Sequence, residues 1–501
     1  MKRVSSHRSV KRNLKDRYVS MIALGGCIGT GLFVASGNAI SQAGPGGGLL
    51  AYVLMGIMVY FLMTSLGEMA TNLPVSGSFA EYGSKYIDPA VGFALGWNYW
   101  FNWAITVAVD VSTSAIVMRF WWPNVPSWIW SAATLVLIFL INAASVKAFG
   151  KTEYWLSFIK IFTVIAFLIV GVLTIVGIMG GGHPVGLSNF TYKKAPFVGG
   201  IPAIISVFVV AGFSFQGTEL VGVTAGESTD PSRSVPKAIH QTFWRILLFY
   251  ILAIAVIAAL IPYTSHYLLS SSASNVTTSP FTLVFKRAGL ATAASVMNAV
   301  ILIAVLSAAN SGMYASTRVL YSMGRNGYAP RVFGKVNRRG IPIWSLVITI
   351  LVSLATFISS FAGPEIYVWL VAASGLTGFI AWLGIAVAHL RFRRAFVRQG
   401  HRLSELKYHA TLFPLGPILA IVLCLIVIFG QNVTAFIDLN WEKIGITYIS
   451  VPLVLILYLF YKIKHHTHLI PLDQVDVSPH TNENFQNQTA AEKKQINSKN
   501  S

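Results

Sequence analysis

The sequence predicts an all-α integral membrane protein with twelve transmembrane helices, arranged as two inverted repeats of five helices followed by two further helices. Three observations lead to this prediction: twelve apolar runs, a one-sided distribution of basic residues, and two runs that glycine interrupts in matching places. The chain of 501 residues is 54% hydrophobic and 11% charged, whereas a soluble domain has about 25% charged residues. Such a chain cannot cover a water-facing surface, so we assign it to a bilayer.

The apolar runs are each long enough to cross a bilayer, which takes about 20 residues of helix. The first run follows a basic N-terminus, as in a signal peptide. Because glycine interrupts it and eleven more runs follow, we expect an uncleaved first span. The twelve runs are 18–42, 48–72, 90–118, 127–146, 154–179, 199–225, 242–262, 289–320, 342–361, 366–390, 411–430 and 446–463.

Basic residues gather on one side of the predicted bilayer. Lys160 lies within a span. If the N-terminus is cytoplasmic, the outer segments hold only six of the 37 Lys and Arg residues, and most of the others lie in cytoplasmic segments. The six are Arg119, Lys193, Lys194, Lys286, Arg287 and Lys443. This asymmetry fits the positive-inside rule for an even number of spans with both termini in the cytoplasm. Because the basic clusters flank spans, the net charge of +20 does not indicate nucleic-acid binding.

The first ten spans divide into two halves of five, which therefore have opposite orientations, as in many secondary transporters. The polar composition of the C-terminal tail predicts disorder. The predicted units are a cytoplasmic N-terminal tail at 1–17, a first repeat at 18–182, a second repeat at 197–391, helices eleven and twelve at 411–463, and a disordered cytoplasmic tail at 469–501.

The first span of each half contains a glycine-rich break. The first break reads GGCIGTGLF from Gly25 to Phe33, and the second reads GFSFQGTE from Gly212 to Glu219. Glycine frees backbone N–H and C=O groups that hydrocarbon cannot satisfy, so an unwound stretch must be buried in protein or line a cavity. Paired breaks in corresponding positions indicate a transporter binding site. The alternative is that these glycines only allow close helix packing.

The chemistry of the two breaks suits an α-amino acid, which carries a carboxylate and an ammonium on one carbon. The half-helix after a break presents free N–H groups, and the half-helix before a break presents free C=O groups. We expect the carboxylate to bind around Ile28, Gly29, Thr30 and Gly31. We expect the ammonium to bind carbonyls in the segment that contains Gly212, Phe213 and Phe215.

Ionisable residues within spans are costly and functional by default. Because a buried lysine readily changes its protonation state, Lys160 is our candidate for proton coupling, and a fixed structural ion pair is the alternative. Glu219 follows the second break, so we assign it to coupling or gating first and to a substrate ammonium second. Asp110, near the outer end of span three, is expected to be interfacial, and Glu68 is expected to be structural or to act in gating.

Three aromatic residues are further candidates for the site. Tyr99 and Trp103 are four residues apart, on one face of a helix, where their rings suit a cation or an aliphatic side chain. Phe213 lies within the second break and is a candidate lid. The alternative for each ring is ordinary packing or an aromatic belt at the membrane surface.

The chain lacks the motifs of several other classes of protein. We find no nucleotide-binding motif, no metal-ligand spacing and no nucleophile–base pair, so we predict no cofactor, no metal and no enzymatic activity. A transporter of this kind must then use an ion gradient or the gradient of its substrate. A rival hypothesis is a sensor that binds the same ligand and signals to a membrane partner through the outer segment 263–288 and the tail.

Several segments resemble the amino acid permeases of the amino acid–polyamine–organocation superfamily. They are IGTGLF at 28–33, AGP at 43–45, GE at 67–68 with Pro74, FSFQGTEL at 213–220 and AGES at 225–228. The similarity covers residues 15–465. It implies the five-plus-five inverted-repeat (LeuT-type) fold with helices 1 and 6 broken, uptake of an L-amino acid and coupling to protons.

Within this family, the chain looks most like the bacterial members that are specific for lysine. The supporting segments are 93–103 (FALGWNYWFNW), 243–250, 307–317 and 378–385. The resemblance implies import of L-lysine across the plasma membrane by alternating access, with histidine and arginine as alternative substrates. It also implies that the amine of Lys160 stands where sodium-coupled relatives bind a cation. Relatives with uncharged substrates share a glutamate at the position of Glu219, so Glu219 alone does not select lysine.

Overall fold

The computed structural model describes residues 10, 14–26, 28–29, 31–269, 279–290, 292–362 and 364–478. This part of the chain consists of helices and their connections, and it contains no named β-strand. Eight of its helices are long and apolar enough to cross a membrane, or nine if the bent pair Trp441–Tyr448 and Ser450–His465 forms one span. The prediction of an all-α, multi-pass membrane protein is confirmed.

The helices that build the described part of the protein are α1 Asp16–Gly25, η1 Gly31–Ala35, α2 Ser36–Asn72, α3 Phe79–Tyr86, α4 Pro89–Met118, α5 Ser127–Ala144, α6 Val146–Ile175, η2 Ser188–Phe190, α7 Gly200–Phe215, α8 Leu220–Thr224, η3 Ala225–Glu227, α9 Pro231–Arg245, η4 Ile246–Ile251, α10 Leu252–Leu260, α11 His266–Leu269, α12 Pro280–Arg287, α13 Ala293–Arg325, α14 Ile343–Ser353, α15 Ala355–Ala362, α16 Pro364–Arg398, η6 Leu403–Glu405, α17 Leu415–Gly430, α18 Val433–Ile437, α19 Trp441–Tyr448, α20 Ser450–His465 and η7 Leu472–Gln474.

The boundary between the first two predicted spans lies inside α2, which consists of two helices joined at a kink. The chain bends at Gly44, where φ is 77°, and Pro45 follows. Glycine adopts this left-handed conformation without steric cost. A Cβ atom at Gly44 would also lie 2.6 Å from the carbonyl oxygen of Pro196. The turn between two spans is therefore built into α2 at a position that only glycine fits.

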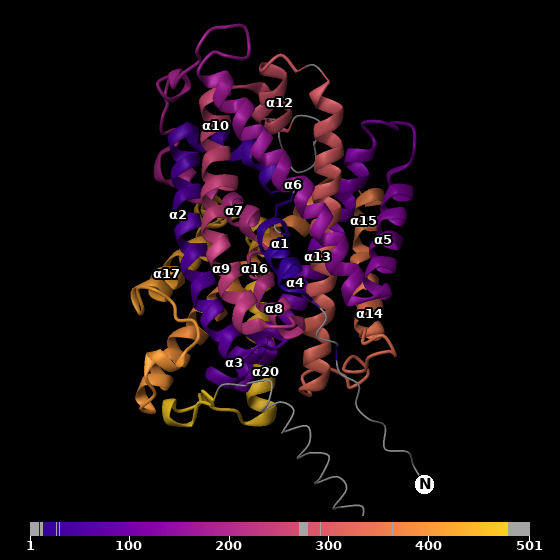
Figure 1. Ribbon diagram of the computed structural model, residues 1–501, viewed down its shortest axis with the longest axis vertical. Coiled ribbons are helices and arrows are strands. Elements are labelled where there is room, and N and C mark those ends of the chain that lie inside the picture. Colours follow the sequence, from indigo (N-terminus) through magenta and orange to yellow (C-terminus); the bar gives the residue numbers. More distant parts are fainter. Residues whose placement is uncertain are drawn as a thin grey trace, which may run out of the picture.

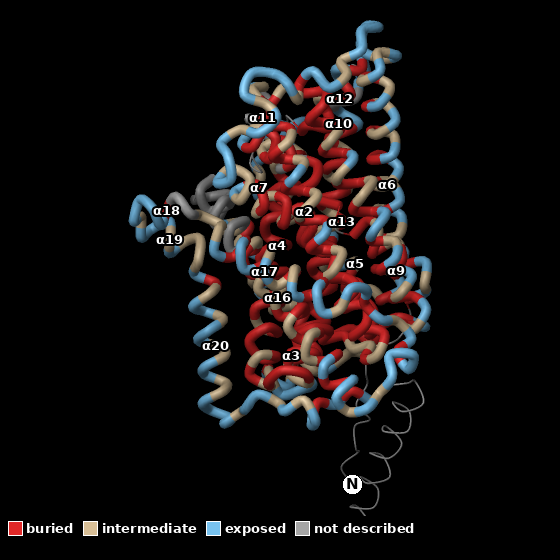
Figure 2. The backbone as a smooth tube through the Cα atoms, turned by 90° about the vertical axis from the view of Figure 1, so that its left-hand side faces the viewer, coloured by how far each residue is buried: buried red, intermediate tan, exposed pale blue. Residues whose placement is uncertain are grey.

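The helices pack around a buried centre. Helix α4 packs along α13 and α16, α2 packs along α7, and α1 lies against α6 and α9. Figure 1 shows α5, α14 and α15 together at one side of the bundle, with α1 and α16 near its middle. In Figure 2 the buried residues fill the middle, whereas α20 is largely exposed at the edge. Long elements from distant parts of the sequence therefore surround α1 and α7.

A buried ion pair joins α2 to α16. The Nε–H of Arg393 donates to Oε1 of Glu68 at 2.5 Å, and its second guanidinium nitrogen donates to Oε2. The backbone N–H of Ala410 donates to the same Oε2 at 2.6 Å. Nε2 of His389 lies 3.3 Å from it. These contacts favour the structural role that the sequence suggested for Glu68.

We expect the substitution Glu68→Gln to destabilise the fold strongly. It would leave the Arg393 charge buried without its carboxylate, and breaking a buried pair costs about 3–5 kcal/mol. The matched control is Asp473→Asn, because Asp473 and Arg398 form a pair whose side chains are each 61% exposed. Exposed pairs contribute about 0–1 kcal/mol. Thermal unfolding of both purified variants in detergent tests this, and equal stability would contradict it.

Residues 469–478 pack against the protein, although the sequence predicted that a disordered tail starts at 469. The N–H of Ile470 donates to the carbonyl of Ile87 at 2.9 Å, and the Gln399 amide donates to the carbonyls of Leu472 and Val475. Two valines of this segment are buried, a local feature that the polar average of the tail conceals. The rest of that tail, and residues 1–9 and 11–13 of the N-terminal tail, lie outside the described residues.

Candidate functional site

The first break interrupts the helical chain between Gly25, where α1 ends, and Gly31, where η1 begins. Within it, the N–H of Ile28 donates to the carbonyl of Gly25 at 3.1 Å, and the N–H of Phe33 donates to the carbonyl of Gly29 at 3.2 Å. Thr30, a predicted ligand of the carboxylate, lies outside the described residues. The start of η1 is thus a place where a helix N-terminus presents backbone N–H groups.

The second break occupies the second half of the segment 212–219 that the sequence predicted. Helix α7 continues through Gly212 and Phe213 to Phe215, and the chain leaves the helix at residues 216–219, with φ at Gly217 of 96°. Gly212 is small for another reason, because the Phe379 ring occupies the space that its Cβ would take. The segment that contains Gly212, Phe213 and Phe215 is therefore the last turn of α7, where the carbonyls of Phe213 and Phe215 accept from the N–H groups of the break itself, at 3.3 Å each.

The two breaks touch each other. A Cβ atom at Gly31 would lie 2.5 Å from Cα of Ser214 and 2.9 Å from its backbone nitrogen. Ser214 is fixed in turn, because its hydroxyl lies 2.9 Å from the Tyr52 hydroxyl and donates to the carbonyl of Val210 at 3.1 Å. The N-terminal end of η1 and the C-terminal end of α7 are thus in contact, and these two ends carry opposite partial charges.

A cavity of about 30 Å³ lies between the breaks and α4. This volume holds one or two water molecules, so an amino acid can bind only if the surrounding elements move apart. The lining residues are Gly26, Gly29, Gly31, Trp103, Thr106, Asp110, Phe213, Gln216 and Ala308. Four predicted site residues, Gly29, Gly31, Trp103 and Phe213, come together here, and sequence reasoning missed Thr106, Gln216 and Asp110 as members of the site.

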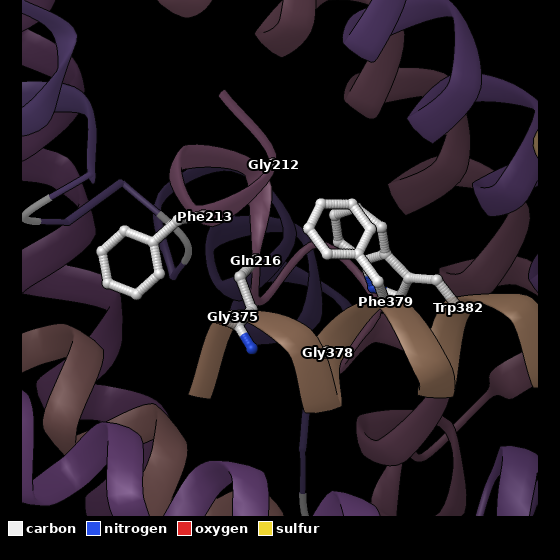
Figure 3. Close-up of a pocket in the computed structure, with 7 residues that line it drawn as sticks. All are labelled: Gly212, Phe213, Gln216, Gly375, Gly378, Phe379 and Trp382. Carbon is white, nitrogen blue, oxygen red and sulfur yellow. The ribbon is translucent and has the colours of Figure 1, made fainter. Parts of the chain in front are cut away.

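A second cavity, which is too small to hold a water molecule, adjoins the first and shares Phe213 and Gln216 with it. Its lining is formed by Gly212, Phe213, Gln216, Gly375, Gly378, Phe379 and Trp382. Figure 3 shows the Phe213 ring on one side of Gln216 and the rings of Phe379 and Trp382 on the other. The Gln216 amide donates to Oδ1 of Asn102 at 2.9 Å. Phe213 and Gln216 line both cavities and so form the wall between them.

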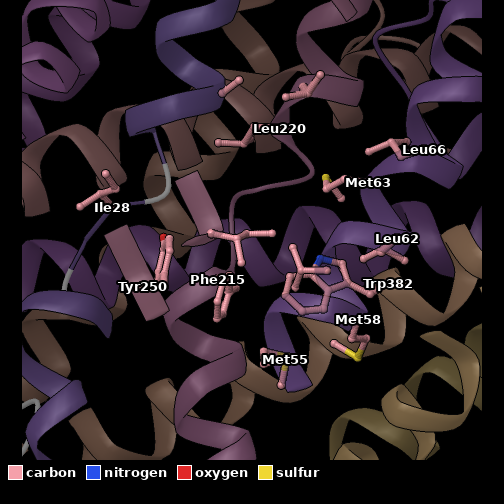
Figure 4. Close-up of a cluster of buried hydrophobic side chains, with 14 of the residues drawn as sticks. Ile28, Met55, Met58, Leu62, Met63, Leu66, Phe215, Leu220, Tyr250 and Trp382 are labelled. Carbon is pink, nitrogen blue, oxygen red and sulfur yellow. The ribbon is translucent and has the colours of Figure 1, made fainter. Parts of the chain in front are cut away.

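Phe215 and Ile28 contribute to packing rather than to the wall of the first cavity. The Phe215 ring stacks on Tyr250 at 4.2 Å between centroids, and both predicted residues lie among buried apolar side chains (Figure 4). The Phe215 carbonyl accepts from the N–H of Thr218 at 3.3 Å. Their side chains therefore hold the breaks in place.

Glu219 is the last residue of the second break, and three neutral donors hold its carboxylate. Tyr99 donates its hydroxyl to Oε1 at 3.1 Å. Oε2 accepts from Nε1 of Trp382 at 3.0 Å and from the N–H of Gly217 at 3.1 Å. These bonds join α4, the second break and α16. Because Glu219 does not line the first cavity, the geometry favours gating over contact with a substrate ammonium.

Lys160 lies in a buried polar network between α6 and α13. Its amine donates to the Ser307 hydroxyl at 2.8 Å and lies 3.9 Å from Oε1 of Glu153, with both side chains 0% exposed. Ser307 donates to Glu153, and the Asn310 amide donates to its other oxygen at 3.2 Å. Sequence reasoning missed Glu153, because this residue directly precedes the apolar run at 154–179.

Known proteins resemble this chain over most of its length. A family model described as "Amino acid permease" matches residues 18–470. The chain belongs to the amino acid permease family. This permease is 56% identical to the lysine-specific permease LysP of Escherichia coli (strain K12) over 464 residues. The aligned residues cover 92% of this chain and 95% of that protein.

Two Lactococcus lactis subsp. cremoris (strain MG1363) proteins are about equally similar to the permease. The lysine-specific permease LysP is 56% identical over 482 residues, which covers 95% of this chain and 94% of the relative. The histidine permease HisP is 53% identical over 475 residues, which covers 95% and 99%. Because these identities nearly coincide, overall similarity does not separate the two substrates, and residues within the site must decide.

Proposed function

We propose that this permease imports L-lysine together with protons, by alternating access at the cavity between the two breaks. The observation that supports this function most strongly is that the N-terminal end of η1 and the C-terminal end of α7 meet at that cavity. Its backbone groups are complementary to the carboxylate and ammonium of an α-amino acid. Lysine is the first candidate because of the two relatives named for it, and histidine or arginine is the alternative.

We also propose the finer architecture that the sequence predicts. The protein has twelve spans, with inverted repeats at 18–182 and 197–391, helices eleven and twelve at 411–463, and both termini in the cytoplasm. The protein would reside in the plasma membrane of a bacterium. The breaks between α1 and η1 and after α7 would then occupy equivalent positions in the two repeats, as in transporters of this class.

Proton coupling is assigned to Lys160, with Glu219 as the gate. The Lys160 amine contacts Ser307 and lies near Glu153, so a proton lost from the amine has a carboxylate within reach. Ser157, one turn before Lys160 on α6, occupies the space left by the missing side chain of Gly25 at the end of α1. The lysine thus lies on the helix that packs against α1, so a change in the charge of its amine would alter the electrostatic field at the first break.

Uptake into proteoliposomes tests the proposed function. We expect labelled lysine to accumulate when the outside is more acidic than the inside, and a protonophore to abolish the accumulation. Unlabelled lysine, arginine, ornithine, histidine and one neutral amino acid serve as competitors. Better competition by histidine than by lysine would assign the protein to the alternative substrate. Uptake no greater than in protein-free liposomes, with folded protein, would refute transport and leave the sensor hypothesis.

A further inference from the structure

We propose that Asp110 binds the cationic group of the substrate side chain, and that it makes the site select amino acids with a permanently charged side chain. This inference rests on the proposed function, because it names the specificity residue of the same site. It replaces the interfacial role that the sequence suggested for Asp110. It also gives a physical reason why lysine should be preferred over histidine.

Asp110 lies deep in the protein. It is 3% exposed and lines the cavity between the breaks. Helix α4 continues from Asp110 to Met118, which places the carboxylate about 12 Å from the end of that helix at 1.5 Å per residue. The sequence placed Asp110 near the membrane surface only because it lies in the second half of its apolar run. A carboxylate at this depth is costly and marks a functional site.

Asp110 belongs to a stripe of side chains on one face of α4. Trp103, Thr106 and Asp110 follow one another at intervals of three and four residues, which places them on the same face, and all three line the cavity. The stripe extends about 10 Å along the helix axis. An aromatic ring at one end and a carboxylate at the other suit an aliphatic stem that carries a terminal cation.

The other buried carboxylates near the site, those of Glu219, Glu227 and Glu153, do not line the cavity. Glu219 accepts from Tyr99, Trp382 and Gly217. Glu227 pairs with Arg318 at 3.0 Å and accepts from the Tyr314 hydroxyl at 2.9 Å. Glu153 belongs to the Lys160 network. Of the side chains that line the cavity in the described part of the chain, Asp110 is the one that carries a formal charge.

A carboxylate at this position distinguishes substrates by charge. A hydrogen bond to a carboxylate is strong with any donor, but a cationic donor adds a Coulomb attraction, which grows in a site that excludes water. A lysine, ornithine or arginine side chain brings a full charge, whereas histidine is mostly neutral at pH 7. The site should therefore prefer the first three over histidine and over neutral amino acids.

The test compares Asp110→Asn, Asp110→Glu and the matched control Asp438→Asn, whose aspartate is exposed in a turn. Competition binding to purified protein uses lysine, its neutral analogue norleucine and ornithine, which is one methylene shorter. We expect Asp110→Asn to weaken lysine binding about 10- to 100-fold and to change norleucine binding much less. The control should match the wild type. Equal losses for lysine and norleucine, or no loss for either, would overturn the proposal.

The variant Asp110→Glu tests the same inference without removing the charge. It extends the carboxylate by one methylene, so we expect the ratio of ornithine to lysine affinity to rise about tenfold. An unchanged ratio in folded protein would overturn the proposal even if Asp110→Asn failed to fold. Failure of the proposed function is distinguished from failure of this inference, because in that case the wild-type protein itself would bind no lysine.

Discussion

Lys160→Ala is expected to abolish lysine accumulation driven by a proton gradient, with a loss of at least about 100-fold in initial rate. The Lys160 side chain is 0% exposed and donates to Ser307 at 2.8 Å. Alanine removes the one group in this network that we assign to carrying the proton, and it also leaves the Glu153 carboxylate buried without its cation. The matched control is Lys151→Ala on the same helix, because Lys151 is exposed.

The double variant Lys160→Ala/Glu153→Gln separates coupling from a purely structural ion pair. It removes both charges, so it avoids the cost of a single buried charge, which is about 3–5 kcal/mol. If Lys160 carries the proton, this variant should still exchange labelled for unlabelled lysine across the membrane but should not accumulate lysine under a proton gradient. Recovery of proton-driven accumulation in the double variant would assign Lys160 to structure alone.

Gly31→Ala is expected to reduce lysine uptake at least about tenfold. The new Cβ atom would lie 2.5 Å from Cα of Ser214, and this neighbour belongs to the backbone of α7, which cannot turn away as a side chain can. The half-helix η1 would have to shift and open the clamp. Alanine otherwise favours a helix by about 1 kcal/mol over glycine, so a loss of uptake would reflect the contact between the breaks.

The matched control for this prediction is Gly445→Ala in α19, where an added Cβ atom meets no atom within 4 Å. We expect this variant to transport lysine as the wild type does. Initial rates of labelled lysine uptake, normalised to the amount of folded protein, provide the comparison. If Gly31→Ala were as active as Gly445→Ala, the close contact between the two breaks would not matter for transport.

Backbone chemistry made much of the site predictable from the sequence, because glycine is visible as a break in an apolar run. Gly29, Gly31, Trp103 and Phe213 were predicted as site residues and lie around one cavity. The position of the second break was less predictable. Gly212 lies within α7, where its small size accommodates the Phe379 ring, and such a tertiary contact leaves no mark on local sequence.

Two charged residues show why depth cannot be derived from an apolar run alone. Asp110 appeared to be near the membrane surface, yet α4 places it against both breaks. Glu153 directly precedes a predicted span, yet α6 begins at Val146 and brings it into the Lys160 network. The packing of α4 against the breaks decides the position of Asp110, and the early start of α6 decides the position of Glu153. An apolar run shows neither of these features.

A cryo-electron microscopy structure of the protein with bound lysine tests the central claim most directly. Our account predicts lysine in the cavity between the breaks, with its carboxylate at the N–H groups around Gly29 and Gly31 and its α-ammonium at the last carbonyls of α7. Its side-chain ammonium should lie within hydrogen-bond distance of Asp110. Lysine bound outside this cavity, or with its carboxylate directed at α7, would contradict the account.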